Sequence, residues 1–156
     1  MANESATYRK SIVFQLKDES YALPVDQIGL IERMQPITRV PQTAPFVKGV
    51  INLRGVVTPV IDLRIRFGLD PKEIDEATRI IIVHLEEMEV GLVVDAANDV
   101  IDIPEDAIEP APELVGTVDV DYIDGVAKVD QRLLILLNLG KVLAKEEVND
   151  LNVLEG

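Results

Sequence analysis

Two apolar, β-branched runs, Val47 to Leu53 and Val56 to Asp62, stand on either side of the dipeptide Arg54-Gly55. Two such runs joined by a two-residue break that contains glycine are typical of a β-hairpin. Glycine adopts positive φ at little steric cost, so Gly55 permits the reversal and Arg54 is expected at an exposed tip. The alternative is a turn with no further role.

The segment after this hairpin has the signals of a short helix. Asp62 is a suitable N-cap for residues Leu63 to Phe67, and Gly68 is a natural stop. Asp70 to Ala77 then form a charged connector, which is the best candidate for a boundary between two halves of the chain.

Alternating or β-branched apolar runs predict strands elsewhere along the chain. Their residue ranges are 11–17, 21–25, 28–34, 79–85, 89–95, 98–103, 117–122, 126–129 and 132–137. The proline-rich segments 35–45 and 104–112 should be irregular connections. Residues after Leu139 have the apolar periodicity of a C-terminal helix.

An internal repeat relates the two halves. Residues 11–26 align with residues 80–95 at an offset of 69, and the segment from Gly49 aligns with the segment from Gly125 at an offset of 76. The matched pairs are Leu16/Leu85, Leu23/Leu92, Val25/Val94, Asp26/Asp95, Gly49/Gly125, Val50/Val126, Asp62/Asn138 and Leu63/Leu139. An insertion around Glu105 to Val115 accounts for the change of offset. The alternative is a chance alignment of β-branched strands.

The repeat predicts a mainly all-β fold of two similar units, residues 11–69 and 78–140, each of about five short strands. Short strands that must hide their edges favour barrels over open sheets. Units of this size are marginal alone, so they should pack together and leave a groove between them. The second unit has Asp130-Gln131 in place of Arg54-Gly55, as expected if one hairpin tip acquired a partner.

Composition excludes several classes of function. The 156 residues include no cysteine and one histidine, so disulfide frameworks, thiolate metal sites, cysteine nucleophiles and multi-histidine metal sites within one chain are excluded. A polar N-terminus and the lack of a long apolar run predict a soluble intracellular protein. A net charge of −13 argues against nucleic-acid binding.

The basic residues are concentrated in one segment. Between Arg33 and Phe67 six basic residues face one acid, Asp62, whereas the rest of the chain is strongly acidic. This distribution favours a docking surface for an acidic or polar partner. Arginines solvated along strand edges are the alternative.

No motif predicts catalysis. His84 lies within a strand pattern without a second histidine or a nucleophile motif near it, which favours a structural or surface role. The acidic run VDVDYIDG lacks the ligand order of a calcium loop, so its aspartates are expected on the solvent face of a strand. Phosphate-binding and nucleophile-elbow motifs are absent from the sequence, and neither a cofactor nor a metal is expected.

The segment ITRVPQTAPFVKGVINLRGVVTPVIDLRIRFGL, with VGLVVDAANDVIDI farther on, resembles the CheW family of bacterial chemotaxis coupling proteins. The resemblance covers residues 8–145 as a single domain and leaves 146–156 as a tail. It implies two SH3-like five-stranded β-barrels and an adaptor without catalysis. Such adaptors bridge chemoreceptor cytoplasmic tips to the regulatory domain of the histidine kinase CheA. A cytoplasmic location at the receptor array is implied, without direct membrane insertion.

The resemblance also implies binding residues. Receptor binding would involve Ile28, Leu30, Arg54, Gly55, Gly91, Asp95, Ala97 and Val100. Kinase binding would involve Val25, Leu30, Val40, Glu109 and Leu114. Many members carry glutamate where this chain has Leu30, so the role of position 30 is open. A free-standing double-barrel regulatory module of a kinase or another signalling assembly would share the fold and is the alternative function.

Overall fold

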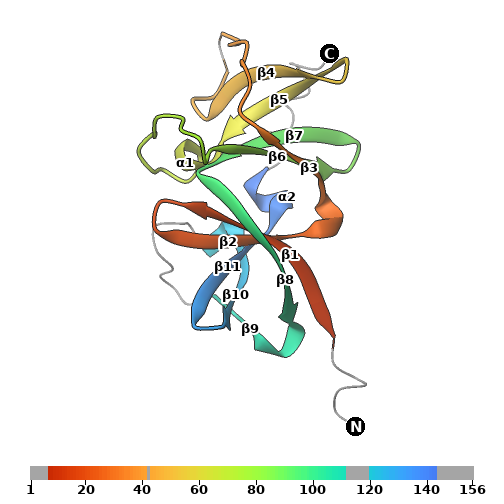
Figure 1. Ribbon diagram of the computed structural model, residues 1–156, viewed down its shortest axis with the longest axis vertical. Coiled ribbons are helices and arrows are strands. Elements are labelled where there is room, and N and C mark those ends of the chain that lie inside the picture. The colour runs from red at the N-terminus through yellow and green to blue at the C-terminus, as the bar shows by residue number, and fades with distance from the viewer. Residues whose placement is uncertain (1–6, 42, 112–119, 144–156) are drawn as a thin grey trace.

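Residues 7–41, 43–111 and 120–143 of a computed structural model are described, and they form two β-sheets (Figure 1). The first three strands are β1 (Tyr8–Leu16), β2 (Glu19–Pro24) and β3 (Ile28–Arg33), with a 3-10 turn, η2 (Val25–Gln27), between the last two. The hairpin of β4 (Val47–Leu53) and β5 (Val56–Asp62) follows, and helix α1 (Leu63–Arg66) begins directly after it. The hairpin, its two-residue turn and the Asp62 cap are as the sequence predicts, since Asp62 accepts hydrogen bonds from the backbone nitrogens of Arg64 and Ile65.

The later elements follow a charged connector. They are β6 (Arg79–Leu85), β7 (Met88–Val94), β8 (Ala96–Pro104), η3 (Glu105–Ala107), β9 (Ile108–Glu109), η4 (Val120–Tyr122), β10 (Ile123–Val129), β11 (Arg132–Leu137) and α2 (Leu139–Val142). The strand expected over 117–122 is wrong where it can be compared, because Val120–Tyr122 form a 3-10 turn. The expected C-terminal helix is present as the single turn of α2, and the tail beyond Leu143 lies outside the described residues.

The two sheets do not correspond to the two halves of the chain. One sheet, called here the central sheet, has the strand order β3-β6-β7-β5-β4 and uses one continuous stretch of sequence. The other, the terminal sheet, has the order β8-β1-β2-β11-β10-β9 and combines both ends of the described chain. The central sheet is therefore inserted between β2 and β8, and the expected division into residues 11–69 and 78–140 is wrong.

Parallel pairing explains why the connector is no boundary. Strand β5 lies parallel to β7, and β2 lies parallel to β11. Parallel neighbours require a crossover, which α1, residues 70–77 and β6 supply in the central sheet. The connector thus lies within one structural unit.

In each sheet, backbone contacts join a segment that follows one edge strand to the opposite side of the same sheet, which curls the sheet toward the barrel shape that the sequence predicts. Thr38, beyond the end of β3, exchanges two hydrogen bonds with Val50 of β4, at 2.9 and 2.8 Å. In the terminal sheet, β9 continues from β8 through η3 and pairs with β10. Both approaches require glycine, because a Cβ at Gly49 would lie 2.0 Å from the Thr38 oxygen and one at Gly125 would lie 2.7 Å from the Glu109 oxygen.

The internal repeat is confirmed by equivalent contacts at matched positions. Asp62 and Asn138 are both N-caps, of α1 and α2. The backbone nitrogen of Asp62 donates to the Phe46 oxygen, and that of Asn138 donates to the Tyr122 oxygen, each at 2.8 Å. In the structure, however, the hairpin β1–β2 completes the sheet of the second repeat and β6–β7 completes that of the first.

Among the described residues, three apolar clusters form the core. Each sheet has a cluster of its own, which includes Val13, Ala22 and Leu134 in the terminal sheet and Ile51, Val60 and Ile82 in the central sheet. The largest lies between the sheets and takes residues from both, together with α2; its members include Phe14, Leu16, Tyr21, Leu23, Ile61, Ile81, Val83, Leu92, Ile135 and Leu139. Figure 1 shows α2 between the two layers. This inter-sheet core makes the two sheets one structural body.

The repeat predicts the effect of exchanging one turn residue. Arg54 and Gly55 have φ of 55° and 85°, and their equivalents Asp130 and Gln131 have φ of 51° and 66°. A side chain in this region costs about 1 kcal/mol relative to glycine. We expect Gln131→Gly to raise the free energy of unfolding by ~0.5–1 kcal/mol, measured by denaturant titration. The reverse change, Gly55→Gln, is the matched control and should destabilise; an effect of the opposite sign in either variant would contradict this account of the turns.

Candidate partner-binding site

The tip of the β4–β5 hairpin presents a cation with apolar neighbours. The side chain of Arg54 is exposed and has no hydrogen-bond or ion-pair partner among the described residues. The turn beneath it is fixed by a 2.8 Å hydrogen bond from the backbone nitrogen of Gly55 to Asn52 Oδ1. Val56 and Val57 are 55% and 49% exposed beside it. The sequence predicts the arginine tip but not these exposed valines, because a strand pattern does not tell which residues extend beyond the neighbouring strands.

Ile28 and Ala97 occupy equivalent places in the two sheets. Ile28 pairs with Val83 in β6, and Ala97 pairs with Phe14 in β1. Both side chains are partly buried against the inter-sheet core. The structure therefore places these two candidate residues at the margin of the junction between the sheets, one on each side.

Val100 is the most exposed apolar residue of β8, at 57%. Its repeat equivalent, Ile31 of β3, is 39% exposed and was not predicted as a binding residue. The register supports their equivalence, since Val100 pairs with Ile12 and Ile31 pairs with Ile81. The repeat offset of 69 could have identified Ile31 from the sequence.

Leu30 and Gly91 lie toward the interior of the central sheet. Both are register partners of Ile82, and Leu30 packs against the apolar cluster on that side. Gly91 is buried, and a Cβ there would lie 2.8 Å from Ile80 Cγ2. The absence of a side chain at Gly91 leaves room for its neighbours within the sheet, and Gly91 presents no surface to solvent.

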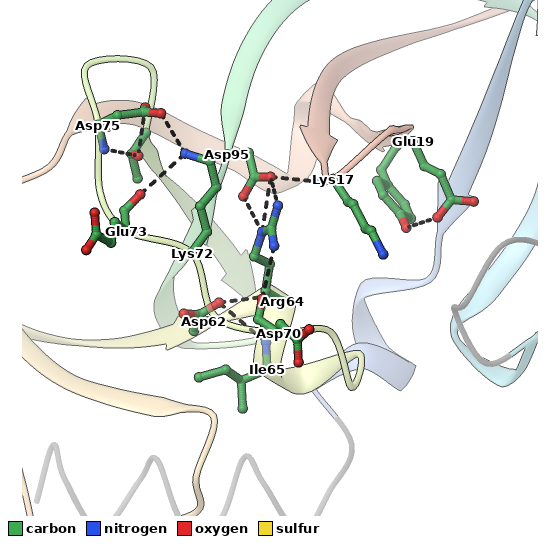
Figure 2. Close-up of polar contacts among 12 residues, drawn as sticks. Lys17, Glu19, Asp62, Arg64, Ile65, Asp70, Lys72, Glu73, Asp75 and Asp95 are labelled. Atoms are coloured by element: carbon green, nitrogen blue, oxygen red, sulfur yellow. Dashed lines mark hydrogen bonds and ion pairs between the residues drawn. The ribbon is translucent and has the colours of Figure 1, made fainter.

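Asp95 is the single residue between β7 and β8, where the chain passes from the central to the terminal sheet. Figure 2 shows its carboxylate between the guanidinium of Arg64 and the β1–β2 turn. Arg64 Nε lies 2.8 and 3.1 Å from the two carboxylate oxygens, and Arg64 Nη2 lies 2.6 Å from Oδ2. The backbone nitrogen of Lys17 donates to Oδ2 at 2.8 Å. Asp95 is thus fully engaged within the protein.

The charges of this cluster reinforce one another. Partial burial acts to raise the pKa of Asp95, but the hydrogen bonds from Arg64 and from the Lys17 backbone, with the charge of Arg64, outweigh it and hold that pKa below its usual range. The hydrogen bond to Asp95 raises the pKa of Arg64. Both side chains are mostly buried, with exposures of 14% and 15%, so the pair is little screened by solvent.

The predicted kinase-binding residues fall in different places. Val25 is half-buried in η2, and Glu109 is exposed in β9. Val40 lines a groove of about 780 Å³ between the proline-rich link and β4, together with Ile37, Val47 and Ile65. Arg39 and Lys48 also line this groove. Leu114 lies outside the described residues.

The basic segment divides into engaged and free cations. Lys48 lies 3.7 Å from Asp62, and Arg64 is held by Asp95. Arg66 lies between the rings of Phe46 and Tyr122, with its Cζ 5.0 and 4.8 Å from their centroids, and its Nε donates to the Val142 oxygen at 2.9 Å. These partners could not be read from the sequence because they come from residues far apart in the chain. Only part of the segment, including Arg54, is therefore available to a partner.

The described residues contain no arrangement typical of catalysis or metal binding. No group of three histidine, cysteine or acidic side chains among them could hold a metal ion. His84 lies on the surface with its Nδ1 3.4 Å from Glu89 Oε2. No helix in the described part of the chain is long and apolar enough to cross a membrane.

Comparisons with known proteins agree with this geometry. The CheW-like domain family matches residues 10–147. The chain is 48% identical over 146 residues to the chemotaxis protein CheW of Bacillus subtilis, covering 94% of each chain. It is 36% identical to the chemotaxis protein CheW of Klebsiella aerogenes, covering 88% of this chain and 82% of that one. The crystal structure of scaffolding protein TtCheW from Thermoanaerobacter tengcongensis matches with a TM-score of 0.83 and 36% identity, over 90% of this chain and 96% of that chain.

The duplicated two-sheet fold and these matches define a chemotaxis adaptor and not an enzyme. The chain belongs to the CheW family. The family resemblance and the mainly β fold that the sequence predicts are thereby confirmed.

The Asp95 cluster predicts a pH-dependent contribution to stability. Because the pKa of Asp95 is depressed in the folded protein, its contribution is present above the unfolded value of about 3.9 and is lost as pH falls through the folded value. We expect Asp95→Asn to lower the free energy of unfolding by ~1–3 kcal/mol at pH 7. The difference from wild type should shrink below about pH 4, measured by denaturant titration from pH 7 to 3. A difference that stays constant over this range would contradict the ion-pair role.

Proposed function

We propose that this protein couples the cytoplasmic tips of chemoreceptors to the regulatory domain of the histidine kinase CheA. The observation that carries the proposal is the exposed hairpin tip, where Arg54 has no partner among the described residues and two exposed valines flank it. Two further arginines of the same segment, Arg64 and Arg66, are engaged inside the molecule. Family membership indicates the class of partner, and the exposed hairpin tip is a surface to which such a partner can bind.

The receptor surface lies at the margin between the two sheets. A receptor tip is a long helical hairpin, so it would bind by burying an apolar helix face. Ile28 on the central sheet and Ala97 and Val100 on the terminal sheet would supply the apolar contacts. Arg54 and Gly55 at the hairpin tip would orient the helix through charge. Gly91 and Asp95 would not contact the receptor themselves. They would support this surface, Gly91 through packing within the central sheet and Asp95 through its bonds at the joint between the sheets.

The kinase surface lies on the central sheet. Val40 in the groove beside the proline-rich link, with the partly buried Val25 and Leu30, would bind an apolar surface of the CheA regulatory domain. Glu109 lies on β9 of the terminal sheet, and there it would contact a second kinase domain. With these two surfaces the adaptor would act in the cytoplasm at the membrane-associated receptor array.

A charge reversal at the hairpin tip tests the receptor surface. We expect Arg54→Asp to weaken binding of a soluble receptor-tip fragment about tenfold, measured by isothermal titration calorimetry, with an unchanged free energy of unfolding. Arg33→Asp, the same change at another exposed arginine of the central sheet, is the matched control and should bind as wild type does. Equal affinity of Arg54→Asp and wild type would remove Arg54 from the receptor surface.

An acidic side chain in the groove tests the kinase surface. We expect Val40→Glu to weaken binding of the isolated CheA regulatory domain about tenfold while the affinity for the receptor fragment stays unchanged. Tyr8→Glu, at a 60% exposed position of the terminal sheet, is the control. If Val40→Glu lowered both affinities equally, the two surfaces would not be separate.

A further inference from the structure

The chain passes between the two sheets at two places, and these joints are built differently. At the first, η2 connects β2 to β3, and it has no side-chain cap. Gln27 within it has a buried Oε1 without a hydrogen-bond partner among the described residues. At the second, Asp95 alone connects β7 to β8 and is held by four side-chain hydrogen bonds. The second joint is therefore the more tightly fixed of the two.

The contacts of Asp95 reach both sheets. Its backbone nitrogen donates to the Gln15 oxygen in β1 at 3.0 Å, and its carboxylate accepts from the Lys17 backbone nitrogen in the β1–β2 turn. Both partners belong to the terminal sheet. The same carboxylate accepts from Arg64 of α1, which begins directly after β5 of the central sheet.

Arg64 is itself held in place on the central side. Its backbone nitrogen donates to Asp62 Oδ1 at 2.9 Å, and its Nη1 donates to the Asp70 oxygen at 3.0 Å (Figure 2). A planar guanidinium held at several points has little rotational freedom. The pair Arg64–Asp95 is thus a rigid link from the end of β5 to the β1–β2 turn.

We propose that Arg64 and Asp95 are positioning residues whose ion pair fixes the angle between the two sheets and so keeps the receptor-binding residues of both sheets in one surface. The second part rests on the proposed function, because it requires Ile28 of the central sheet and Val100 of the terminal sheet to bind the same helical hairpin. Asp95 then affects receptor binding without touching the receptor. The kinase groove is lined by residues of the central sheet, its proline-rich link, α1 and the connector after α1, and by none of the terminal sheet. Kinase binding should therefore not depend on this angle.

The sheet angle is measured directly with two spin labels. The chain has no cysteine, so Glu87→Cys in the β6–β7 turn and Lys128→Cys in β10 provide one exposed label on each sheet. We expect Asp95→Asn and Arg64→Lys to broaden or shift the label-to-label distance distribution in double electron–electron resonance. Arg64→Lys keeps the positive charge beside Asp95, so this variant is less prone to unfold than Asp95→Asn, but lysine cannot make the bidentate contact with the carboxylate. Arg132→Ala is the matched control, because it removes an exposed 3.0 Å ion pair with Asp99 that lies within the terminal sheet.

Binding measurements on the same variants complete the test. Asp95→Asn and Arg64→Lys should weaken binding of the receptor-tip fragment by about fivefold or more and leave binding of the CheA regulatory domain within twofold of wild type. Unchanged distance distributions in both folded variants would overturn the positioning role. Altered distributions with unchanged receptor affinity would overturn its link to binding. If wild type bound neither partner, the proposed function would fail, while the distance measurement would still decide whether the ion pair sets the angle.

Discussion

The shared apolar core between the two sheets is the constraint on which the rest of the structure depends. Strands β1, β2, β6, β7 and β11 each bury alternate residues in their own sheet and the intervening ones against the other sheet. A strand buried on both faces cannot leave its partner sheet without exposing large apolar side chains such as Phe14 and Ile81 to water. Neither sheet is therefore an independent domain, although each repeats the same local design.

The shared core also determines where the polar contacts between elements lie. Arg64, Arg66 and Asp95 lie at helix α1 and at the joint between the sheets, and there they link elements that the core has already brought together. Apolar side chains meet solvent at the hairpin tip and on β3 and β8, and also at Tyr8, Ile74 and Leu133. An adaptor requires such a division, in which a rigid interior holds separate surfaces in a fixed relation.

Much of the fold was predictable because local signals agree with it. The Arg54-Gly55 turn, the Asp62 cap and the repeat pair Gly49/Gly125 depend on neighbouring residues or on backbone geometry that only certain residues adopt. The exchange of the hairpins between the two repeats, with β1–β2 in the sheet of the second repeat and β6–β7 in that of the first, was not predictable. Parallel pairing causes this exchange, and it joins strands that are distant in sequence. The family resemblance placed Asp95 among the receptor-binding residues, and its partners Arg64 and Lys17, which are distant in sequence, could be identified only in three dimensions.

The central claim is that one rigid body carries two surfaces that bind different partners at the same time. The most direct measurement is an NMR titration in which the isotope-labelled protein is first saturated with the CheA regulatory domain and then titrated with a receptor-tip fragment. The account predicts that the first partner shifts resonances around Val40, and that the second shifts a separate set around Ile28, Ala97 and Arg54 without reversing the first. Displacement of the kinase domain by the receptor fragment would contradict it.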